Sequence, residues 1–358
     1  MIEMRSDTFT LPTPAMLQAI VRAELGNDGY HEDPTVRQLE TLAAARLGKE
    51  EACLMPSGTM ANLALVKAHC SAIRNIVLVG DESDIFVFER EGSSLFPDLV
   101  YEPVPTQPDG TFRLGDLERK FNELEKKGSG LALVCLENPH NLKGGIVLPH
   151  GYIQLIGEFV RARGAKLHLD GARLFNAAVA SKTDAAEIVR PADSIQFCLS
   201  KGLAAPIGSL AVGSSGLIDK VRNIRKILGG AMRQAGIIAA PGIIALEQMV
   251  TRLAEDHLNA RRLAEGLATV PGVEVDLNTV QTNTVVFTIT DPLFTCKTFI
   301  TAAHRRGLNL SEFGFGRIRA VVHHGTPESE VRKALEIVMQ LMESGAMEVG
   351  ILPQPLGA

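Results

Sequence analysis

The sequence predicts an α/β fold with a mostly parallel sheet, followed by a smaller α+β unit towards the C-terminus. Short apolar runs rich in β-favouring residues alternate with amphipathic helical stretches, as in parallel sheets with helices on both faces. Several of these runs are followed directly by polar residues, at the edge of the sheet where ligands usually bind. After Pro271 and Gly272 the pattern changes to short strands and two helices, which indicates a second unit.

Length and composition narrow the class of protein. At 358 residues the chain can form a large core and two domains, and a net charge of -5 with both signs spread along it argues against a nucleic-acid-binding surface. No apolar run approaches the roughly 20 residues of a membrane span, and the acidic first residues without an apolar run lead us to expect no secretory signal. The five cysteines form no C-x-x-C pair. We therefore expect a cytoplasmic protein without a metal site.

We predict three segments: an extended arm at 1–14, a large domain at 15–245 and a small C-terminal domain at 246–358. One of the two domains could be assembled from both ends of the chain. Apolar residues recur at helical spacing from Leu246 to about Leu267, which predicts one long helix between the domains.

The local signals for elements of the large domain are capping residues and apolar strands. Asp33 followed by Pro34 is typical of a helix start, and Gly48 of a helix end. The expected helices are 15–22, 34–47, about 58–69, 114–127, 151–163 and 185–189. The expected strands are 52–55, 75–79, 100–104, 131–136, 166–170, 195–199 and 208–212, the last of which could run antiparallel.

The C-terminal domain is expected to contain strands at 273–275, 284–290 and 318–323, and helices at 294–306 and 328–342. Arg317 and Arg319 flank Ile318 on the third of these strands, so both should point to the same face. One of them could bind a substrate carboxylate through two parallel hydrogen bonds.

Asp170 ends one predicted strand, and Lys201 follows the end of the next predicted strand. An isolated Ser-Lys-Gly is usually a solvated turn, because short motifs occur often by chance. A lysine and an aspartate at two neighbouring strand ends are what pyridoxal phosphate needs: the amine forms a Schiff base and the carboxylate keeps the ring nitrogen protonated. The pair therefore indicates a site for this cofactor.

The segment Pro56–Asn62 lies between a predicted strand and a predicted helix. Its small residues and hydroxyls, with the free amides of a helix start, could bind a phosphate group. Alone, Ser57 would be explained as a helix N-cap, but the lysine and aspartate favour the phosphate interpretation.

Two further polar segments are ambiguous. His140, in Glu137–Asn141 after an apolar strand, is either a surface loop residue or a proton carrier. The loop 229–234, preceded by Arg222, Arg225 and Lys226, is either a solvated basic helix end or a ligand of a phosphate in its own or a neighbouring subunit.

Seven ordered motifs resemble the L-threonine aldolases, pyridoxal phosphate enzymes with the aspartate aminotransferase fold, known as fold type I. The motifs are R-S-D-T-x-T (5–10), Y-x-E-D-P-T (30–35), P-S-G-T-M-A-N (56–62), E-N-P-H-N (137–141), H-L-D-G-A-R (168–173), L-S-K-G (199–202) and G-G-A-M-R-Q-A-G (229–236). They extend to about Arg319. The resemblance implies a homotetramer with active sites at subunit borders.

The resemblance also implies a role for each matching residue. Lys201 would form the Schiff base and Asp170 would hold the ring nitrogen. The phosphate would be bound by Ser57, Gly58, Thr59 and Arg233. The substrate carboxylate would be held by Ser6, Arg173 and Arg319, with Arg173 also near the cofactor phenolic oxygen. His140 would approach the substrate β-hydroxyl.

The sequence departs from the family pattern at two positions. Asp84 stands where a histidine normally stacks on the cofactor ring, and Phe86 could take over the ring face. His31 stands where the family has glycine after Tyr30. The pocket on the aldehyde side would then contain Tyr30, His31, Asp84 and His140, and we expect both changes to affect substrate preference more than cofactor binding.

The resemblance implies retro-aldol cleavage of L-threonine or L-allo-threonine to glycine and an aldehyde, and the altered pocket could also admit L-phenylserine. The alternatives are β-elimination, transaldol transfer or racemisation with the same cofactor, or a relative that binds the cofactor without turnover. A nucleotide-binding α/β protein is a third alternative, but the chain lacks G-x-G-x-x-G and Walker motifs.

Overall fold

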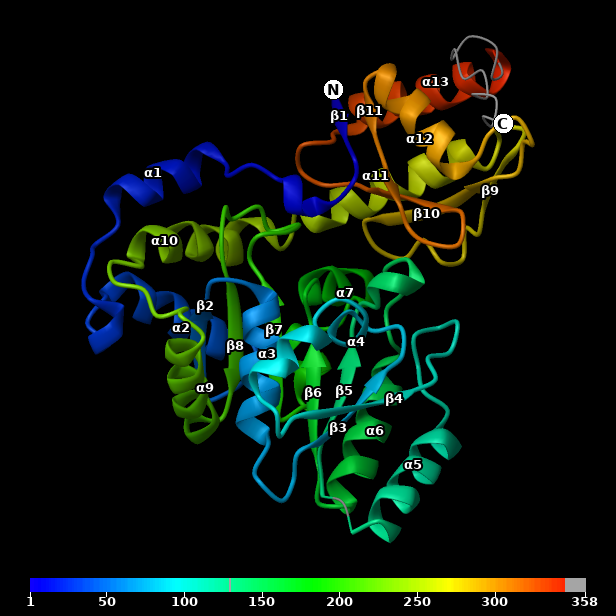
Figure 1. The fold of residues 1–358 in the computed structure, drawn as a ribbon. Helices are drawn as coiled ribbons and strands as arrows, with labels where there is room; N and C mark the ends of the chain where they lie inside the picture. Colours follow the sequence, from blue (N-terminus) through cyan, green and yellow to red (C-terminus); the bar gives the residue numbers. More distant parts are fainter. Residues whose placement is uncertain (129, 345–358) are drawn as a thin grey trace, which may run out of the picture. The chain divides into compact units, whose positions relative to one another are not determined.

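The computed structural model describes residues 1–128 and 130–344, and the chain divides into two compact units. The larger unit is Thr10–Leu253 (Figure 1). The smaller unit joins Met1–Phe9 to the chain from Ala254 onward, so it is formed by both ends of the sequence. The last part of the predicted C-terminal domain, residues 345–358, lies outside the described residues.

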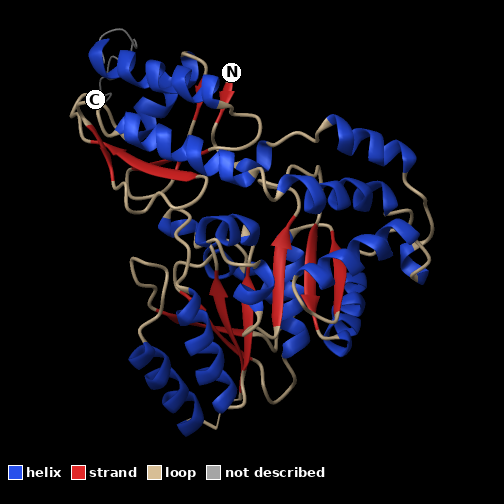
Figure 2. Ribbon diagram, turned by 180° about the vertical axis from the view of Figure 1, so that it is seen from behind, coloured by secondary structure: helices blue, strands red, loops and turns tan. Residues whose placement is uncertain are grey.

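A seven-stranded sheet organises the larger unit, in the order β2-β8-β7-β6-β5-β3-β4. Figure 2 draws its strands in red. The strands are β2 (Glu51–Met55), β3 (Ile76–Gly80), β4 (Val100–Val104), β5 (Leu131–Glu137), β6 (Lys166–Asp170), β7 (Ser194–Cys198) and β8 (Ser209–Gly213). β8 runs antiparallel to β2 and β7, and the remaining neighbours pair in parallel. The predicted α/β class and the mostly parallel sheet are confirmed.

Helices cover both faces of this sheet. They are α1 (Pro14–Arg22), α2 (Pro34–Arg46), α3 (Gly58–His69), α4 (Asp84–Val87), α5 (Leu114–Lys126), α6 (His150–Ala162), α7 (Leu174–Ser181), α8 (Ala185–Val189), α9 (Ser215–Ile227) and α10 (Gly236–Ile244). Short 3₁₀ turns lie at Asp28–Tyr30, Arg90–Leu95 and Asn141–Lys143. α3 and α9 pack on one face in a core of their own, whereas α2, α5, α6 and α10 belong to the core on the other face.

The start of α2 follows from its sequence. Asp33 is the N-cap, and its Oδ1 accepts a hydrogen bond from Val36 N at 3.0 Å. Its Oδ2 accepts from Gly26 N and Gly236 N, at 3.1 and 2.9 Å. One buried carboxylate therefore satisfies a helix start and ties two distant segments to it.

The smaller unit contains an antiparallel sheet in the order β12-β13-β10-β9 and a parallel pair, β1 with β11. Its strands are β1 (Ile2–Glu3), β9 (Val273–Val275), β10 (Thr284–Ile289), β11 (Leu308–Asn309), β12 (Ser311–Glu312) and β13 (Arg317–Val321). Its helices are α11 (Leu253–Leu267), α12 (Cys296–Arg305) and α13 (Glu328–Ser344), with a short turn at Asp7–Phe9. They enclose a separate apolar core.

The predicted single helix from Leu246 to Leu267 is wrong. A π-helical segment, Ala245–Met249, ends the first part, residues 250–252 form a turn, and α11 begins at Leu253. Leu246 and Met249 pack in the core of the larger unit, whereas Leu263 packs in that of the smaller unit. The apolar spacing continues through the break because the residues before it pack in one core and those after it pack in another.

A search of the described residues found no single helix that is both long and apolar enough to cross a membrane. Gly236–Met249 and Leu253–Leu267 meet the test only when they are combined across their bend.

Candidate active site

Adjacent parallel strands bring the predicted site residues to one edge of the sheet. In the β5-β6-β7 register Glu137 pairs with Asp170 and Asp170 with Gln196. Lys201 follows the end of β7 by three residues, and Asp84 follows β3 by four. Because the carboxyl ends of parallel strands meet at one edge, residues distant in sequence converge there.

A cavity of about 270 Å³ lies at this edge. It is lined by Pro56, Ser57, Gly58, Thr59, Asn62, Asp84, Glu89, Asp170, Ala172, Gln196, Cys198, Ser200, Lys201, Pro206, Ile207 and Gly208. The structure therefore brings together the predicted lysine, the predicted aspartate and the start of α3. A Cβ on Gly58 would lie 2.9 Å from Cys198 Sγ, so only glycine allows the helix start to approach β7 this closely.

Asp170 is buried and held by three donors. Asn62 Nδ2 donates to its Oδ2 at 2.9 Å, and Gln196 Nε2 and Ala172 N donate to its Oδ1 at 2.8 and 3.0 Å. All three donors carry no charge, so they satisfy the oxygens of the carboxylate without placing a cation beside it. The aspartate is therefore prepared to pair with a cationic group in the cavity.

Two further buried carboxyl groups lie beside Asp170. Burial, followed by the charges of Asp170 and Asp84, raises the pKa of Glu89 to about 7. Glu89 Oε2 accepts a hydrogen bond from Asn62 Nδ2 at 3.0 Å. Burial and the same two charges raise the pKa of Glu137 well above its usual range, although it accepts hydrogen bonds from the backbone amides of Asp84 and Asn141. Glu137 thus joins the loops that follow β3 and β5.

Asp84 and His140 lie in these two loops. Asn141 Nδ2 donates to both carboxylate oxygens of Asp84, at 3.0 and 3.2 Å, and Arg173 Nη1 donates to Asn141 Oδ1 at 3.4 Å. His140 is buried rather than on the surface, and burial lowers its pKa to about 4. Its Nδ1 makes no hydrogen bond within the described residues. His140 is therefore a neutral imidazole with an available ring nitrogen.

Seven predicted site residues do not line this cavity: Ser6, Tyr30, His31, His140, Arg173, Arg233 and Arg319. Tyr30 is exposed, His31 lines a different cavity, and Arg233 lies beside the turn that carries them, since its carbonyl accepts a hydrogen bond from Asp28 N. Arg222 and Arg225, which precede the glycine-rich loop 229–234, make ion pairs: Arg222 with Glu40 and Glu51, and Arg225 with Asp28.

Ser6 and Arg319 belong to the smaller unit. Arg319 Nη2 donates to the carbonyl of Arg5 at 3.1 Å, and its guanidinium lies 4.9 Å from the ring centroid of Phe313. Arg317 also lies over Phe313, which agrees with the prediction that the two arginines share a face of β13.

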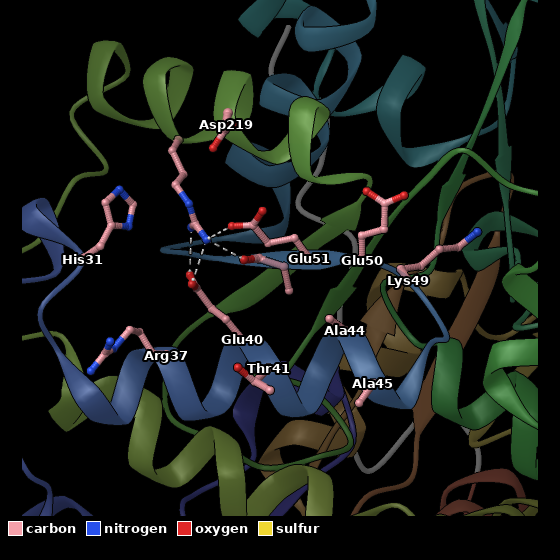
Figure 3. Close-up of a pocket in the computed structure, with 12 residues that line it drawn as sticks. His31, Arg37, Glu40, Thr41, Ala44, Ala45, Lys49, Glu50, Glu51 and Asp219 are labelled. Atoms are coloured by element: carbon pink, nitrogen blue, oxygen red, sulfur yellow. Dashed lines mark hydrogen bonds and ion pairs between the residues drawn. The ribbon is translucent and has the colours of Figure 1, made fainter.

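A second cavity, of about 560 Å³, lies along the outer strand β2 (Figure 3). Several of its charged residues form ion pairs with one another and hydrogen bonds with the backbone of β2. Arg222 pairs with Glu40 and Glu51 and donates to the carbonyl of Ala52 at 3.0 Å, while Glu40 accepts from Leu54 N at 2.7 Å. These contacts satisfy backbone groups that an edge strand would otherwise expose.

The sequence analysis did not single out Asn62, Gln196, Glu89 or Glu137. Asn62 and Glu137 stand inside quoted motifs, but their partners could not be read from spacing. Gln196 gives a usable signal, because a glutamine inside an apolar buried strand must have a hydrogen-bond partner.

Comparison with known proteins places this site in a class and a family. The fold is that of the fold type I enzymes that depend on pyridoxal phosphate, and a solved threonine aldolase of Leishmania major has a TM-score of 0.79 at 19% identity, covering 94% of this chain and 98% of that one. The chain is 40% identical over 346 residues to low-specificity L-threonine aldolase 1 of Arabidopsis thaliana, covering 95% of this chain and 96% of that protein.

The low specificity L-threonine aldolase of Escherichia coli K12 is 43% identical over 267 residues, which is 75% of this chain and 79% of that protein. The family model of the β-eliminating lyases matches residues 3–290. The chain belongs to the β-eliminating lyase family, a family of lyases that depend on pyridoxal phosphate, and the resemblance noted in the sequence is confirmed.

Proposed function

We propose that this protein binds pyridoxal 5'-phosphate in the 270 Å³ cavity and cleaves L-β-hydroxy-α-amino acids to glycine and an aldehyde. The observation that carries the proposal is that Lys201, Asp170 and the start of α3 line one cavity. They match the cofactor in chemistry: an amine for its aldehyde, a carboxylate for its ring nitrogen, and amides with hydroxyls for its phosphate. When bound, the cofactor supplies a ring that accepts the electron pair released from the substrate.

Each residue has a defined task in the proposed site. Lys201 would hold the cofactor through its amine, and Asp170 would keep the ring nitrogen protonated. Ser57, Gly58 and Thr59 would bind the phosphate at the start of α3, where the helix dipole favours an anion. Ser57 also caps the helix, since its hydroxyl accepts from Met60 N at 3.2 Å.

His140 is proposed to take the proton of the substrate β-hydroxyl, directly or through a water molecule. Its neutral ring can accept a proton, and its Nδ1 makes no hydrogen bond within the described residues. As the hydroxyl loses its proton, its oxygen forms the carbonyl of the aldehyde and the Cα–Cβ bond breaks. Return of a proton to Cα gives glycine, so the atoms of the substrate are all accounted for.

Arg173, Ser6 and Arg319 are proposed to bind the substrate carboxylate. Arg173 is nearly buried, and the hydrogen bond from its Nη1 to Asn141 links it to the loop of His140. Asn141 in turn holds Asp84, so the proposed carboxylate ligand and the residue at the family's histidine position share one amide.

The protein is proposed to be a homo-oligomer, a tetramer by resemblance. Exposed apolar side chains gather on and around α1: Leu11, Leu17, Val21 and Leu25. Tyr30, His31 and Arg233 would then contribute to the site of a neighbouring copy, which fits their position outside the cavity of their own chain. Light scattering after size exclusion tests this, with Val21→Glu expected to lower the measured mass.

A substrate panel tests the proposed function. Protein loaded with pyridoxal phosphate is incubated with L-threonine, L-allo-threonine and L-phenylserine, and aldehyde with glycine is measured against pyruvate with ammonia. Equal amounts of aldehyde and glycine are expected. Pyruvate with ammonia would instead indicate β-elimination. A higher kcat/KM for phenylserine than for threonine would indicate that the pocket on the aldehyde side favours an aryl side chain.

A further inference from the structure

A stripe of polar residues lies between α3 and the strands β6 and β7, and all but the half-buried His69 are buried. Three elements contribute two residues each: Asn62 and His69 of α3, His168 and Asp170 of β6, and Ser194 and Gln196 of β7. The pair in α3 is seven residues apart, about two helical turns, and each strand pair is two apart, so the members of a pair share a face. The strand residues in between, Leu167, Leu169, Ile195 and Phe197, belong to the core on the opposite face.

The stripe forms a continuous hydrogen-bonded chain behind Asp170. Asn62 Nδ2 lies 2.9 Å from Asp170 Oδ2, and Asn62 Oδ1 lies 3.1 Å from His168 Nε2. His168 Nδ1 lies 2.9 Å from Ser194 Oγ, which lies 2.8 Å from His69 Nε2. His168 and Ser194 are completely buried and Asn62 is 2% exposed, so water cannot replace the bonds that join these three residues.

The hydrogen bonds of this stripe all run in one direction, which Asp170 sets. An ionised carboxylate only accepts hydrogen bonds, so the amide NH₂ of Asn62 must face it and the amide oxygen must face His168. His168 therefore carries its proton on Nε2. Burial lowers the pKa of His168 to about 3, so the ring is neutral and its Nδ1 is an acceptor.

The remaining two groups follow from the tautomer of His168. Ser194 must donate its hydroxyl proton to Nδ1, and its oxygen is then free to accept from His69 Nε2. The second hydrogen of the Asn62 amide is used by Glu89, 3.0 Å away. Every donor along this chain has one acceptor, and reversing any member would place two acceptors or two donors face to face.

We propose that His168, Ser194 and His69 are positioning residues that fix the amide of Asn62, so that Asp170 is correctly oriented for the ring nitrogen of the cofactor. The inference rests on the proposed function for the identity of the ligand. It goes beyond it by assigning a purpose to three residues that do not line the cavity. Apolar side chains could fill this space between a helix and a sheet, and burying polar groups instead is costly unless they are all paired.

The first test needs no cofactor. Protein labelled with ¹⁵N-histidine is studied by NMR in the cofactor-free form, where the two nitrogens of a neutral imidazole give well separated signals. We expect His168 to have its proton on Nε2. In Ser194→Ala the donor to Nδ1 is lost, so the tautomer should become mixed. A proton on Nδ1 in the wild-type protein would overturn the proposed direction.

The second test measures cofactor affinity. Hydrogen-bonded partners that orient a ligating group are typically worth about 10- to 100-fold in metal sites, and we expect about tenfold weaker binding of pyridoxal phosphate by Ser194→Ala. Ser209→Ala is the matched control, because Ser209 is also a buried strand serine and its hydroxyl has no hydrogen-bond partner in the described chain. Equal dissociation constants for the two variants would contradict the inference.

Catalysis gives a third readout that separates the two proposals. Ser194→Ala should lower kcat with KM for the amino acid nearly unchanged, because the stripe acts on the cofactor ring and not on the substrate carboxylate. If the wild-type protein binds the cofactor and releases no aldehyde, the proposed function fails. The tautomer and the dissociation constants would still decide the role of the stripe.

Discussion

The two charged cavities of the larger unit differ in what their charges are bonded to. In the cavity along β2, Arg222 is matched by Glu40 and Glu51, so opposite charges satisfy one another. In the cavity at the strand ends, Asp170 is held by amides without charge. The cavity at the strand ends is about half as large, yet its central carboxylate, Asp170, is held without a paired cation. Bonding pattern, and not size, identifies the site.

Replacing Lys201 is expected to have the largest effect on activity. Lys201→Ala should abolish aldehyde release from every substrate and remove the visible absorbance of the loaded protein, because the amine that holds the cofactor is lost. Lys49→Ala, in the cavity along β2, is the matched control and should keep both. Activity in Lys201→Ala comparable to that of the control would place the chemistry elsewhere.

His140→Asn should lower kcat by about 100-fold or more, the usual contribution of a positioned acid or base. The spectrum of the bound cofactor should stay unchanged, because His140 does not line the cofactor cavity. A variant with normal kcat would remove His140 from the mechanism. Steady-state kinetics with L-threonine and an absorbance spectrum measure both quantities.

Arg222→Met should destabilise the protein without changing kcat per folded molecule. Its side chain is 12% exposed and that of Glu40 is 8% exposed, so the substitution leaves a buried carboxylate without its cation, a loss of about 3 kcal/mol. Urea unfolding measures the loss. A decrease in kcat for the folded variant would mean that the cavity along β2 contributes to the reaction.

The stability of the protein should fall as the pH decreases from about 6.5 to about 4. Burial lowers the pKa of His69 and His168 to about 3 and that of His140 and His257 to about 4. Below the ordinary histidine pKa the unfolded chain therefore binds protons that the folded chain does not, which favours unfolding.

Buried carboxyl groups act in the opposite direction. Burial raises the pKa of Glu40 and Glu89 to about 7, so these two groups lower stability as the pH rises from about 4.5 to 7. Glu137, whose pKa burial also raises, acts in the same direction. The four histidines outnumber these three carboxyl groups, so stability should still fall on the acid side, and His69→Gln should reduce that loss. Urea midpoints at pH 7 and pH 4.5 for both proteins decide this, and equal losses would contradict it.

The smallest expected effect is at a helix cap. Asp33→Ala should cost about 1–2 kcal/mol of stability, since it removes the N-cap of α2 and the acceptor of two further amides. Thermal unfolding measures it. Ser57→Ala removes a cap of the same kind from α3, but it should also weaken cofactor binding if the start of α3 binds the phosphate.

Local signals predicted much of the fold from the sequence. Three features agree with the prediction, because each depends on neighbouring residues: the β6 strand, the helix cap at Asp33 and the antiparallel direction of β8. The break before α11 could not be predicted. The apolar residues on its two sides pack in different cores, but their spacing in the sequence is that of one continuous helix.

The same contrast holds for the candidate site. Lys201, Asp170 and the start of α3 carry recognisable chemistry at strand and helix ends, and the structure places them at one cavity. Asn62 and His168 act through partners more than 100 positions away in the sequence, so their role depends on how α3 lies against β6. Pairing across elements is information that a single sequence does not contain.

The most direct test of the account is to locate the lysine that holds the cofactor. Protein loaded with pyridoxal phosphate is reduced with borohydride, digested and examined by peptide mass spectrometry. The account predicts that the phosphopyridoxyl group is found on the peptide containing Lys201, and that it is absent from this peptide in Lys201→Ala. Labelling of Lys49 beside β2, or of no lysine at all, would contradict it.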